Sequence, residues 1–299
     1  MSVPNDIMVS VCMITFNHEK YIIQAIEGVM MQQTTFPIEL IIGEDCSTDN
    51  TRKICLEYKA NYPELITLRL PESNLGIMKN FTETMYAANG KYIALCEGDD
   101  YWTDQYKLQK QVDFMEFNPE YCLSFHKVQV VSEGVEYLSL YDHLEERQYL
   151  SEEVYDKWTI PTCSVVFLKP SKRIRFPKVI LFGDIYLYLS LLEFGKGYCH
   201  DFCGAVYRRN VNSVSVQNNI ELVKMMFYQY KYMLKRFPKY KKISKRNMNN
   251  WLEGLIYAPY FKGIWKYRVY KMYYNPRLLF TGFFTTTLTS YTFKRKRHI

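Results

Sequence analysis

The chain has 299 residues, enough for one large domain or for a domain of about 200 residues with an appendage. With 48% hydrophobic and 16% aromatic residues, and only 13 Gly and 11 Pro, its composition excludes disordered, collagen-like and low-complexity proteins. The net charge of +7 is unevenly spread: residues 1–215 hold 20 basic and 29 acidic side chains, whereas residues 216–299 hold 18 and 2. The charges therefore predict two domains, 1–215 and 216–299.

Apolar, β-branched segments alternate with helix-length amphipathic ones through the first third of the chain. We expect strands at residues 9–16, 39–44, 67–70 and 92–96, and helices at 19–31, 49–62 and 77–89, the last ended by Gly90. This alternation predicts an α/β fold with a Rossmann-like, mainly parallel sheet flanked by helices, in which ligands gather at the carboxyl ends of the strands. The GxGxxG and GxxxxGK[ST] motifs are missing, which weakens a dehydrogenase or P-loop interpretation.

Three carboxylates follow the predicted strand at 92–96: those of Glu97, Asp99 and Asp100. Close like charges repel each other, and a divalent cation relieves this repulsion. Mg2+ and Mn2+ typically take one or two carboxylates and complete their shell with water and phosphate oxygens. The alternative is a solvated loop whose Asp residues cap the next helix.

Asp45 lies at the carboxyl end of the second predicted strand. A carboxylate there can accept a hydrogen bond from the imide N–H of a uracil or thymine ring. Ser47 and Asp49, which follow it, are residue types typical of a helix N-terminal cap. The pattern thus favours a uridine or thymidine nucleotide as ligand.

Eight scattered cysteines are typical of reduced, mostly buried thiols, which predicts a cytoplasmic protein. The amino terminus has no basic segment ahead of an apolar core and does not have the pattern of a secretory signal. No stretch reaches the roughly 18 apolar residues of a membrane-spanning helix.

Four motifs in a fixed order resemble those of family 2 glycosyltransferases, which have the GT-A fold. They are Thr15–Asn17, Glu44–Thr51, Asn74–Gly76 with Lys79 and Asn80, and Gly90–Asp100. The resemblance covers about residues 7–215. It implies an inverting hexosyltransferase that moves a sugar from a UDP or dTDP donor to an acceptor hydroxyl, in the synthesis of a surface polysaccharide or glycolipid.

The same resemblance implies a donor-binding role for one set of residues: Thr15, Asn17, Glu44, Asp45, Lys79, Glu97, Gly98, Asp99 and Arg208. Asp99 and Asp100 are the implied ligands of Mn2+ or Mg2+, and Glu97 stands where the family has Asp. A helix-surface lysine is an equally good account of Lys79.

Asp184 is the implied catalytic base, at the start of a helix that ends near Gly195. An ordinary N-terminal Asp, favoured by the helix dipole, would give the same sequence. Thr162 and Cys163 match a region that faces the acceptor, although a buried strand entry is an equal alternative.

The segment Tyr207–Ser215 resembles the end of the family's catalytic domain. Asn210 replaces the usual His there, which leaves Arg208 as the expected partner of the donor diphosphate because of its planar set of donors.

Residues 216–299 combine their positive charge with aromatic residues at helical spacing, as in Met226–Phe237. Such helices can lie on an anionic bilayer, which would place the protein at the inner face of the cell membrane and suit a carbohydrate or lipid-linked acceptor. An equal alternative is that the helices only pack on the first domain. Nucleic acid is less favoured, because the acidic domain would repel its phosphates.

Two other functions stay open at this point. Glu97 and Asn210 depart from the family pattern, which would suit a nucleotide-sugar-binding protein without turnover. A nucleotidyltransferase shares the fold and the carboxylates, but it usually needs a loop rich in Gly and Arg or Lys after the first strand, which Asn17–Lys20 does not provide.

Overall fold

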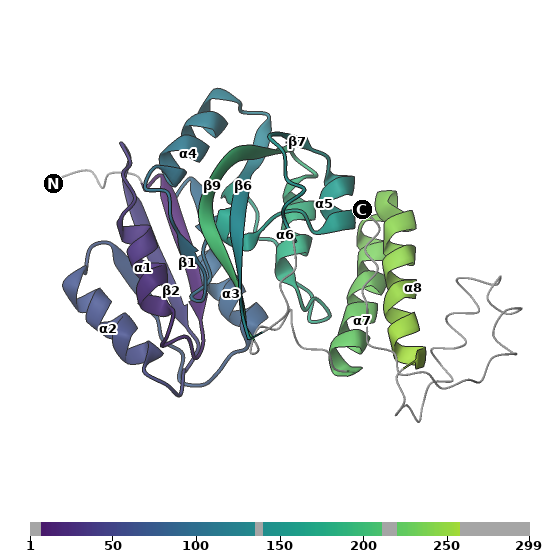
Figure 1. Cartoon of the computed structure of the whole chain (residues 1–299), viewed down its shortest axis with the longest axis horizontal. Coiled ribbons are helices and arrows are strands. Elements are labelled where there is room, and N and C mark those ends of the chain that lie inside the picture. The colour runs from purple at the N-terminus through teal and green to yellow at the C-terminus, as the bar shows by residue number, and fades with distance from the viewer. Residues whose placement is uncertain (1–6, 135–139, 211–219, 258–299) are drawn as a thin grey trace, which may run out of the picture. The chain divides into compact units, whose positions relative to one another are not determined.

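The structure is a computed structural model and describes residues 7–134, 140–210 and 220–257 (Figure 1). The chain divides into two compact units, residues 1–218 and 219–299. The sequence motifs of the aromatic segment after 257, and those of residues 211–215, lie outside the described residues.

The first half of the first unit alternates strands and helices as the sequence predicts. In chain order it contains β1 (Val9–Thr15), α1 (Ile22–Met30), β2 (Ile38–Glu44), α2 (Thr51–Asn61), β3 (Ile66–Arg69), α3 (Ile77–Tyr86) and β4 (Tyr92–Leu95). The prediction that Gly90 ends a helix is wrong, since α3 stops at Tyr86. Gly90 instead permits a close approach of two chain segments, because a Cβ there would lie 2.6 Å from the backbone nitrogen of Ser10.

The second half completes the sheet with shorter and longer strands. It contains β5 (Tyr101–Trp102), α4 (Lys107–Phe117), β6 (Tyr121–Glu133), β7 (Arg147–Tyr149), α5 (Ser151–Lys157), the 3-10 helix η1 (Thr162–Ser164), β8 (Val166–Leu168), α6 (Gly183–Leu191) and β9 (Lys196–Asn210). Because β5 follows Asp100 directly, Asp99 and Asp100 do not cap a helix. The backbone N–H of Tyr106 donates instead to Asp104 Oδ1 at 2.9 Å, just before α4 begins.

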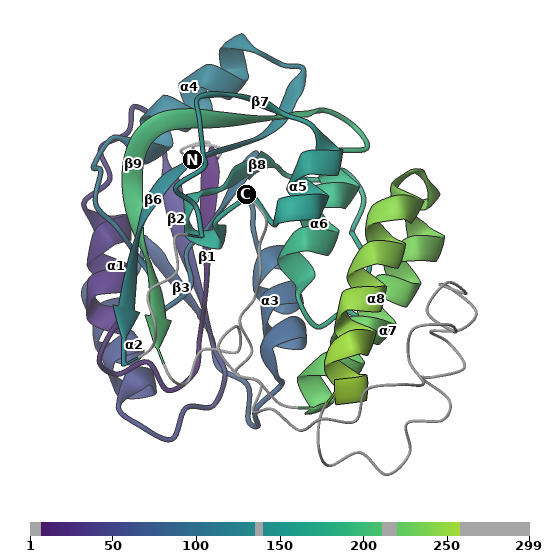
Figure 2. The same ribbon diagram turned by 45° about the vertical axis from the view of Figure 1, so that its right-hand side comes forward.

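Within the described residues the strands form one mixed sheet in the order β3-β2-β1-β4-β8-β6-β9-β5, and β7 pairs with β9. β1 pairs in parallel with both β2 and β4, and β2 in parallel with β3. β8 then runs antiparallel to β4 and to β6. The carboxyl ends of β1, β2 and β4 therefore lie at the same edge of the sheet. Figure 2 shows β1 and β2, which pair in parallel.

Alternating residues of β1 serve opposite faces of the sheet. Val9, Val11 and Met13 belong to the main hydrophobic core together with the buried residues of α1. Cys12 points to the other face, where its thiol lies 3.8 Å from the carbonyl oxygen of Thr84 in α3. The two helices thus cover opposite faces and fix the loops at the sheet edge from both sides.

The second unit, as far as it is described, is a helical hairpin of α7 (Ile220–Arg236), the 3-10 helix η2 (Pro238–Tyr240) and α8 (Lys241–Tyr257). Several of its apolar residues are buried, among them Phe227, Met233 and Met248. A search of the described helices finds none with the length and apolar character needed to traverse a lipid bilayer.

Candidate active site

The loops after β1 and β2 are joined by hydrogen bonds in both directions. The backbone N–H of Asn17 donates to Ser47 Oγ at 3.0 Å, and that of Thr48 donates to Asn17 Oδ1 at 2.8 Å. Asn17 adopts a left-handed backbone with φ of 55°, which Asn tolerates better than most residues. Ser47 therefore joins two loops and does not cap α2, whereas Asp49 does hold the first turn through the N–H of Thr51 at 2.9 Å.

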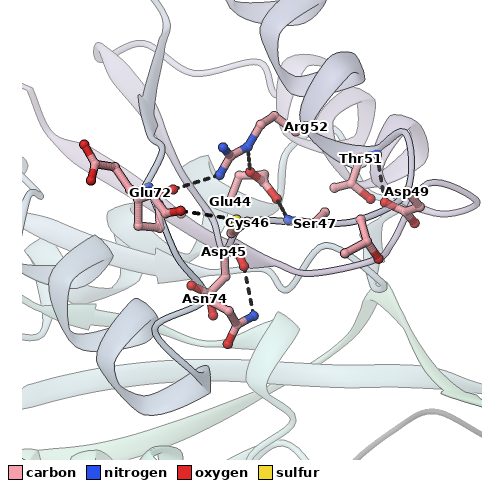
Figure 3. A network of polar contacts seen from close by, with 12 residues as sticks. Glu44, Asp45, Cys46, Ser47, Asp49, Thr51, Arg52, Glu72 and Asn74 are labelled. Carbon is pink, nitrogen blue, oxygen red and sulfur yellow. Dashed lines mark hydrogen bonds and ion pairs between the residues drawn. The ribbon is translucent and has the colours of Figure 1, made fainter.

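Glu44 is fully buried at the end of β2, and its negative charge is compensated by Arg52 (Figure 3). One carboxylate oxygen accepts a hydrogen bond from the backbone N–H of Ser47 at 2.6 Å, and the other pairs with Arg52 Nε. Arg52 also donates to the carbonyl oxygen of Pro71 at 3.1 Å. This places Glu44 in the support of the loop, and a direct contact with the donor stays a prediction.

Asp45 holds a second loop against the end of β2. Its two carboxylate oxygens accept hydrogen bonds from the backbone N–H groups of Leu75 at 2.7 Å and Gly76 at 2.9 Å, and its carbonyl accepts one from the Asn74 side chain at 2.9 Å. Each carboxylate oxygen can accept more than one hydrogen bond. Asp45 thus shapes the loop, and its predicted contact with a base would use the remaining lone pairs.

Gly98 is required by packing at the end of β4. A Cβ at this position would lie 2.6 Å from Thr15 Oγ1 and 3.0 Å from His18 Nδ1. The absence of a side chain lets residues 97–100, called the acidic loop from here on, pack on the loop after β1. As a result His18, which the sequence analysis did not single out, places Nε2 4.0 Å from Asp99 Oδ2.

The three carboxylates after β4 occupy different environments. Asp100 is buried; its Oδ1 accepts the backbone N–H of Arg208 at 2.7 Å, whereas its Oδ2 has no hydrogen-bond partner among the described residues. Glu97 is half-buried, and burial, followed by the charges of Asp99 and Asp184, raises its pKa to about 8. Burial, followed by the charges of Asp99 and Glu97, also raises the pKa of Asp100. The loop therefore concentrates negative charge that the protein leaves only partly compensated.

Arg208 fastens this loop to the rest of the site. Its side chain lies over the rings of Tyr21, at 5.0 Å, and Tyr101, at 4.4 Å. Nη1 donates to the carbonyl oxygen of Asp99 at 2.9 Å, and Nη2 donates to Gln24 Oε1. These contacts occupy much of the guanidinium group, so they favour a positioning role, and the predicted contact with a diphosphate is not tested by them.

Asp184 begins α6 where Gly183 allows a close approach to α3. A Cβ at Gly183 would lie 2.4 Å from Met78 Cε. Asp184 is half-buried, and its Oδ1 accepts the backbone N–H of Ile185 at 2.7 Å. Burial raises the pKa of Asp184 to about 6, and its charge in turn contributes to the raised pKa of Glu97. The structure therefore brings the predicted base to the acidic loop across 87 residues of sequence, from 97 to 184.

The remaining predicted residues divide between site and surface. Cys163 is buried beside Asp100, which helps to raise the pKa of its thiol after burial itself, so it forms part of the wall. Thr162 is half-buried in η1. Lys79 is 61% exposed on α3 and lies 3.9 Å from Glu83, as expected of a helix-surface lysine.

Among the described residues, no group of three or more His, Cys, Asp and Glu side chains is arranged to enclose a metal ion. A preformed cage is not what a donor-bound Mn2+ or Mg2+ needs, because such an ion takes one or two carboxylates and several phosphate or water oxygens. The unpartnered Oδ2 of Asp100 and the repulsion within the acidic loop fit such an ion. Of the two predicted ligands Asp99 is the more accessible, with 19% of its side chain exposed, whereas Asp100 is buried.

Residues 10–168 match the sequence model of glycosyl transferase family 2. An uncharacterised protein of Mycobacterium tuberculosis is 38% identical over 206 residues, which cover 69% of this chain and 60% of that protein. The chain thus spans less than two thirds of the length of this relative.

Two further comparisons agree with the family match. The putative teichuronic acid biosynthesis glycosyltransferase TuaG of Bacillus subtilis is 30% identical over 227 residues, which cover 75% of this chain and 87% of TuaG. The crystal structure of S. aureus TarS residues 1–349 in complex with UDP-GlcNAc aligns over 83% of this chain and 72% of its own, with a TM-score of 0.63 and 17% identity. At this identity the structural match establishes the fold alone, and it confirms the predicted GT-A architecture.

Proposed function

Since the chain belongs to glycosyltransferase family 2, we propose that it transfers a sugar from a UDP or dTDP donor to an acceptor hydroxyl, with inversion at the anomeric carbon, in the synthesis of a cell-surface carbohydrate. One observation carries this proposal: Asp184, with a pKa raised to about 6, lies close enough to the acidic loop to interact with Glu97. A carboxylate suited to act as the base is therefore near the loop that would bind the diphosphate.

In this proposal Asp184 accepts the proton of the acceptor hydroxyl as that oxygen attacks the anomeric carbon. A base whose pKa lies near 6 is ionised at neutral pH and is still basic enough to take the proton. Its Oδ1 accepts the N–H of Ile185, and each carboxylate oxygen has lone pairs for further hydrogen bonds, so the group can still take a proton.

The loops at the sheet edge would hold the donor. The joined loops after β1 and β2, with Thr15, Asn17 and Asp45, would bind the nucleoside, and Glu97 would bind the donor sugar. Asp99, with Asp100 behind it, would hold a Mn2+ or Mg2+ ion, which when bound neutralises negative charge on the departing diphosphate. Arg208 would keep Asp99 in place through its backbone carbonyl.

The first experiment screens UDP- and dTDP-sugars for thermal stabilisation and for release of the nucleoside diphosphate, with and without Mn2+. We expect a matching donor to raise the melting temperature by mass action and to be turned over. Asp99→Asn should lose the stabilisation that depends on Mn2+. The control Asp201→Asn, an exposed residue paired with Lys127, should keep it.

The outcomes separate the alternatives. Release of pyrophosphate from UTP or dTTP in the presence of a sugar 1-phosphate, measured in parallel, would identify a nucleotidyltransferase. Stabilisation without release of diphosphate, even with acceptors present, would identify a binding protein, and either result would refute the proposal.

The hairpin unit supports a second partner, an anionic bilayer. Seven basic residues and no acidic one occur between positions 235 and 246: Lys235, Arg236, Lys239, Lys241, Lys242, Lys245 and Arg246. Each basic residue near such a surface contributes about 1 kcal/mol. Binding to vesicles with phosphatidylglycerol at low salt should therefore fall when the exposed Lys239, Lys241 and Lys242 are changed to Gln. No binding at low salt would refute a membrane role.

A further inference from the structure

Tyr188 carries a buried hydroxyl group for which no hydrogen bond of good geometry is formed within the described residues. The side chain is 1% exposed, and its Oη has no hydrogen-bond partner among the described residues. An unpaired buried hydroxyl lowers stability, so its presence needs a reason. Binding of a ligand hydroxyl would provide one.

Tyr188 shares one side of α6 with Asp184. Residues four apart on a helix lie above one another, with Cβ atoms about 5–6 Å apart. The surroundings agree with this placement, because the pKa of Tyr188 is raised first by burial and then by the charge of Asp184, with a smaller effect of Glu97. The phenol is therefore neutral, and its hydroxyl can act as a hydrogen-bond donor near both carboxylates.

Aromatic side chains border the start of α6. Phe182, two residues before Asp184, packs edge-on against Trp158 with ring centroids 5.3 Å apart. Tyr141 and Tyr207 form a second edge-on pair at 5.7 Å, and Tyr141 lies close enough to Asp184 and Tyr188 for their charges to affect its pKa. Ligand sites commonly combine such apolar rings with a few well-placed polar groups.

We propose that Tyr188 binds the acceptor by donating a hydrogen bond to the hydroxyl next to the one that Asp184 deprotonates, and that the acceptor is therefore a sugar ring with vicinal hydroxyls. This inference rests on the proposed function. Two polar groups one helical turn apart suit two neighbouring hydroxyls of a rigid ring, whereas a simple alcohol could use only one of them.

The main structural rival is Thr162. Thr162 lowers the pKa of Tyr188 as a hydrogen-bonding neighbour, although the two groups do not meet the strict geometry of a hydrogen bond. If Thr162 were the partner of Tyr188, loss of the phenolic hydroxyl would destabilise the protein. If the hydroxyl is reserved for the acceptor, its loss should leave stability unchanged or raise it.

The test compares Tyr188→Phe with Tyr186→Phe, a buried tyrosine on the same helix that packs on Phe176. Thermal unfolding is measured without ligands. Release of nucleoside diphosphate is then measured with the UDP- and dTDP-sugar panel, using octyl glycosides of glucose, galactose, N-acetylglucosamine and rhamnose as acceptors and octanol as the simple alcohol.

For Tyr188→Phe we expect an unchanged or higher melting temperature, an unchanged donor KM, and an acceptor kcat/KM about tenfold lower, the usual effect of one buried hydrogen bond. Tyr186→Phe should leave the acceptor kinetics as in the wild type. A lower melting temperature that Thr162→Val reproduces would overturn the proposal, as would unchanged acceptor kinetics or equal use of octanol and the glycosides.

Failure of this inference is distinguishable from failure of the proposed function. A wild type that turns over donors while Tyr188→Phe behaves like it refutes only the role of Tyr188. Stimulation by none of the glycosides refutes the sugar acceptor. A wild type that releases no diphosphate from any donor refutes the proposed function and this inference together.

Discussion

Replacing Asp184 with Asn should make the protein more stable while it abolishes most turnover. Burial raises the pKa of Asp184 from 3.8 to about 6. Between these two values the folded state binds more protons than the unfolded state, so the free energy of unfolding falls as pH rises through this window and stays lower above pH 6. A shift of about two pKa units corresponds to about 3 kcal/mol, and solvent screening of the half-exposed carboxylate reduces this to about 1–2 kcal/mol.

Asn has nearly the shape of Asp, can still accept the N–H of Ile185, and cannot ionise. At a pH of about 7.5 the Asp184→Asn variant should therefore gain about 1–2 kcal/mol in the free energy of unfolding, and below a pH of about 4 it should gain nothing. Turnover should fall by about 10²- to 10⁴-fold, the usual loss on removal of a general base, whereas donor binding should be nearly unchanged.

Urea unfolding at the two pH values measures the first effect, and release of nucleoside diphosphate measures the second. Asp201→Asn is the matched control, because Asp201 is exposed and paired with Lys127, so its loss should give no gain at either pH. Equal stability of Asp184→Asn and the wild type at the higher pH would refute the electrostatic argument. Normal turnover would refute the assignment of the base.

Three more predictions follow from the site. The kcat/KM of the wild type should decline as pH falls below about 6, because Asp184 must be ionised to take a proton; a flat profile between pH values of about 5 and 7.5 would contradict this. Arg208→Lys keeps the charge but loses the planar contacts, so donor affinity measured by calorimetry should fall about tenfold, whereas Arg147→Lys, an arginine that also stacks on a tyrosine, should leave it unchanged. Gly98→Ala should cost about 1–3 kcal/mol in urea unfolding and weaken donor binding, because the added Cβ meets Thr15; wild-type stability would show that the loop can move aside.

The order of strands and helices up to β4 could be predicted because it depends on local patterns. Each strand is a short apolar run, and each helix has apolar residues at helical spacing, so the pattern of a single segment suffices. Ends of elements were less predictable, as Gly90 shows. It does not end a helix; it lets the chain pass close to the backbone of Ser10, which is 80 residues away in the sequence. The acidic loop and the position of Asp184 at a helix start could be placed in the same way, from strand and helix patterns.

The roles of side chains that contact a loop far away in the sequence could not be predicted. Nothing near Arg208 in the sequence indicates that its guanidinium lies between Tyr21 and Tyr101 or that it holds the carbonyl of Asp99. The pairing of Glu44 with Arg52 is closer in sequence, but it joins a strand end to a helix across a loop, so helical or strand periodicity does not indicate it. The unpartnered hydroxyl of Tyr188 has no sequence signal beyond its four-residue separation from Asp184.

The polar groups of the site are of two kinds: some are hydrogen-bonded within the protein and hold its loops, and others have no such partner and could bind a ligand. Asn17, Glu44 and Asp45 are held by backbone and side-chain partners, which makes the loops rigid. Asp100 Oδ2 and Tyr188 Oη have no such partners among the described residues, and Asp184 is held in an environment that raises its pKa. In a chain selected only for stability we would expect apolar or neutral side chains at these positions, since burying them costs less free energy. These groups are near one another, since the charge of Asp184 affects the pKa of both Glu97 and Tyr188, and their grouping favours a site for a polar ligand.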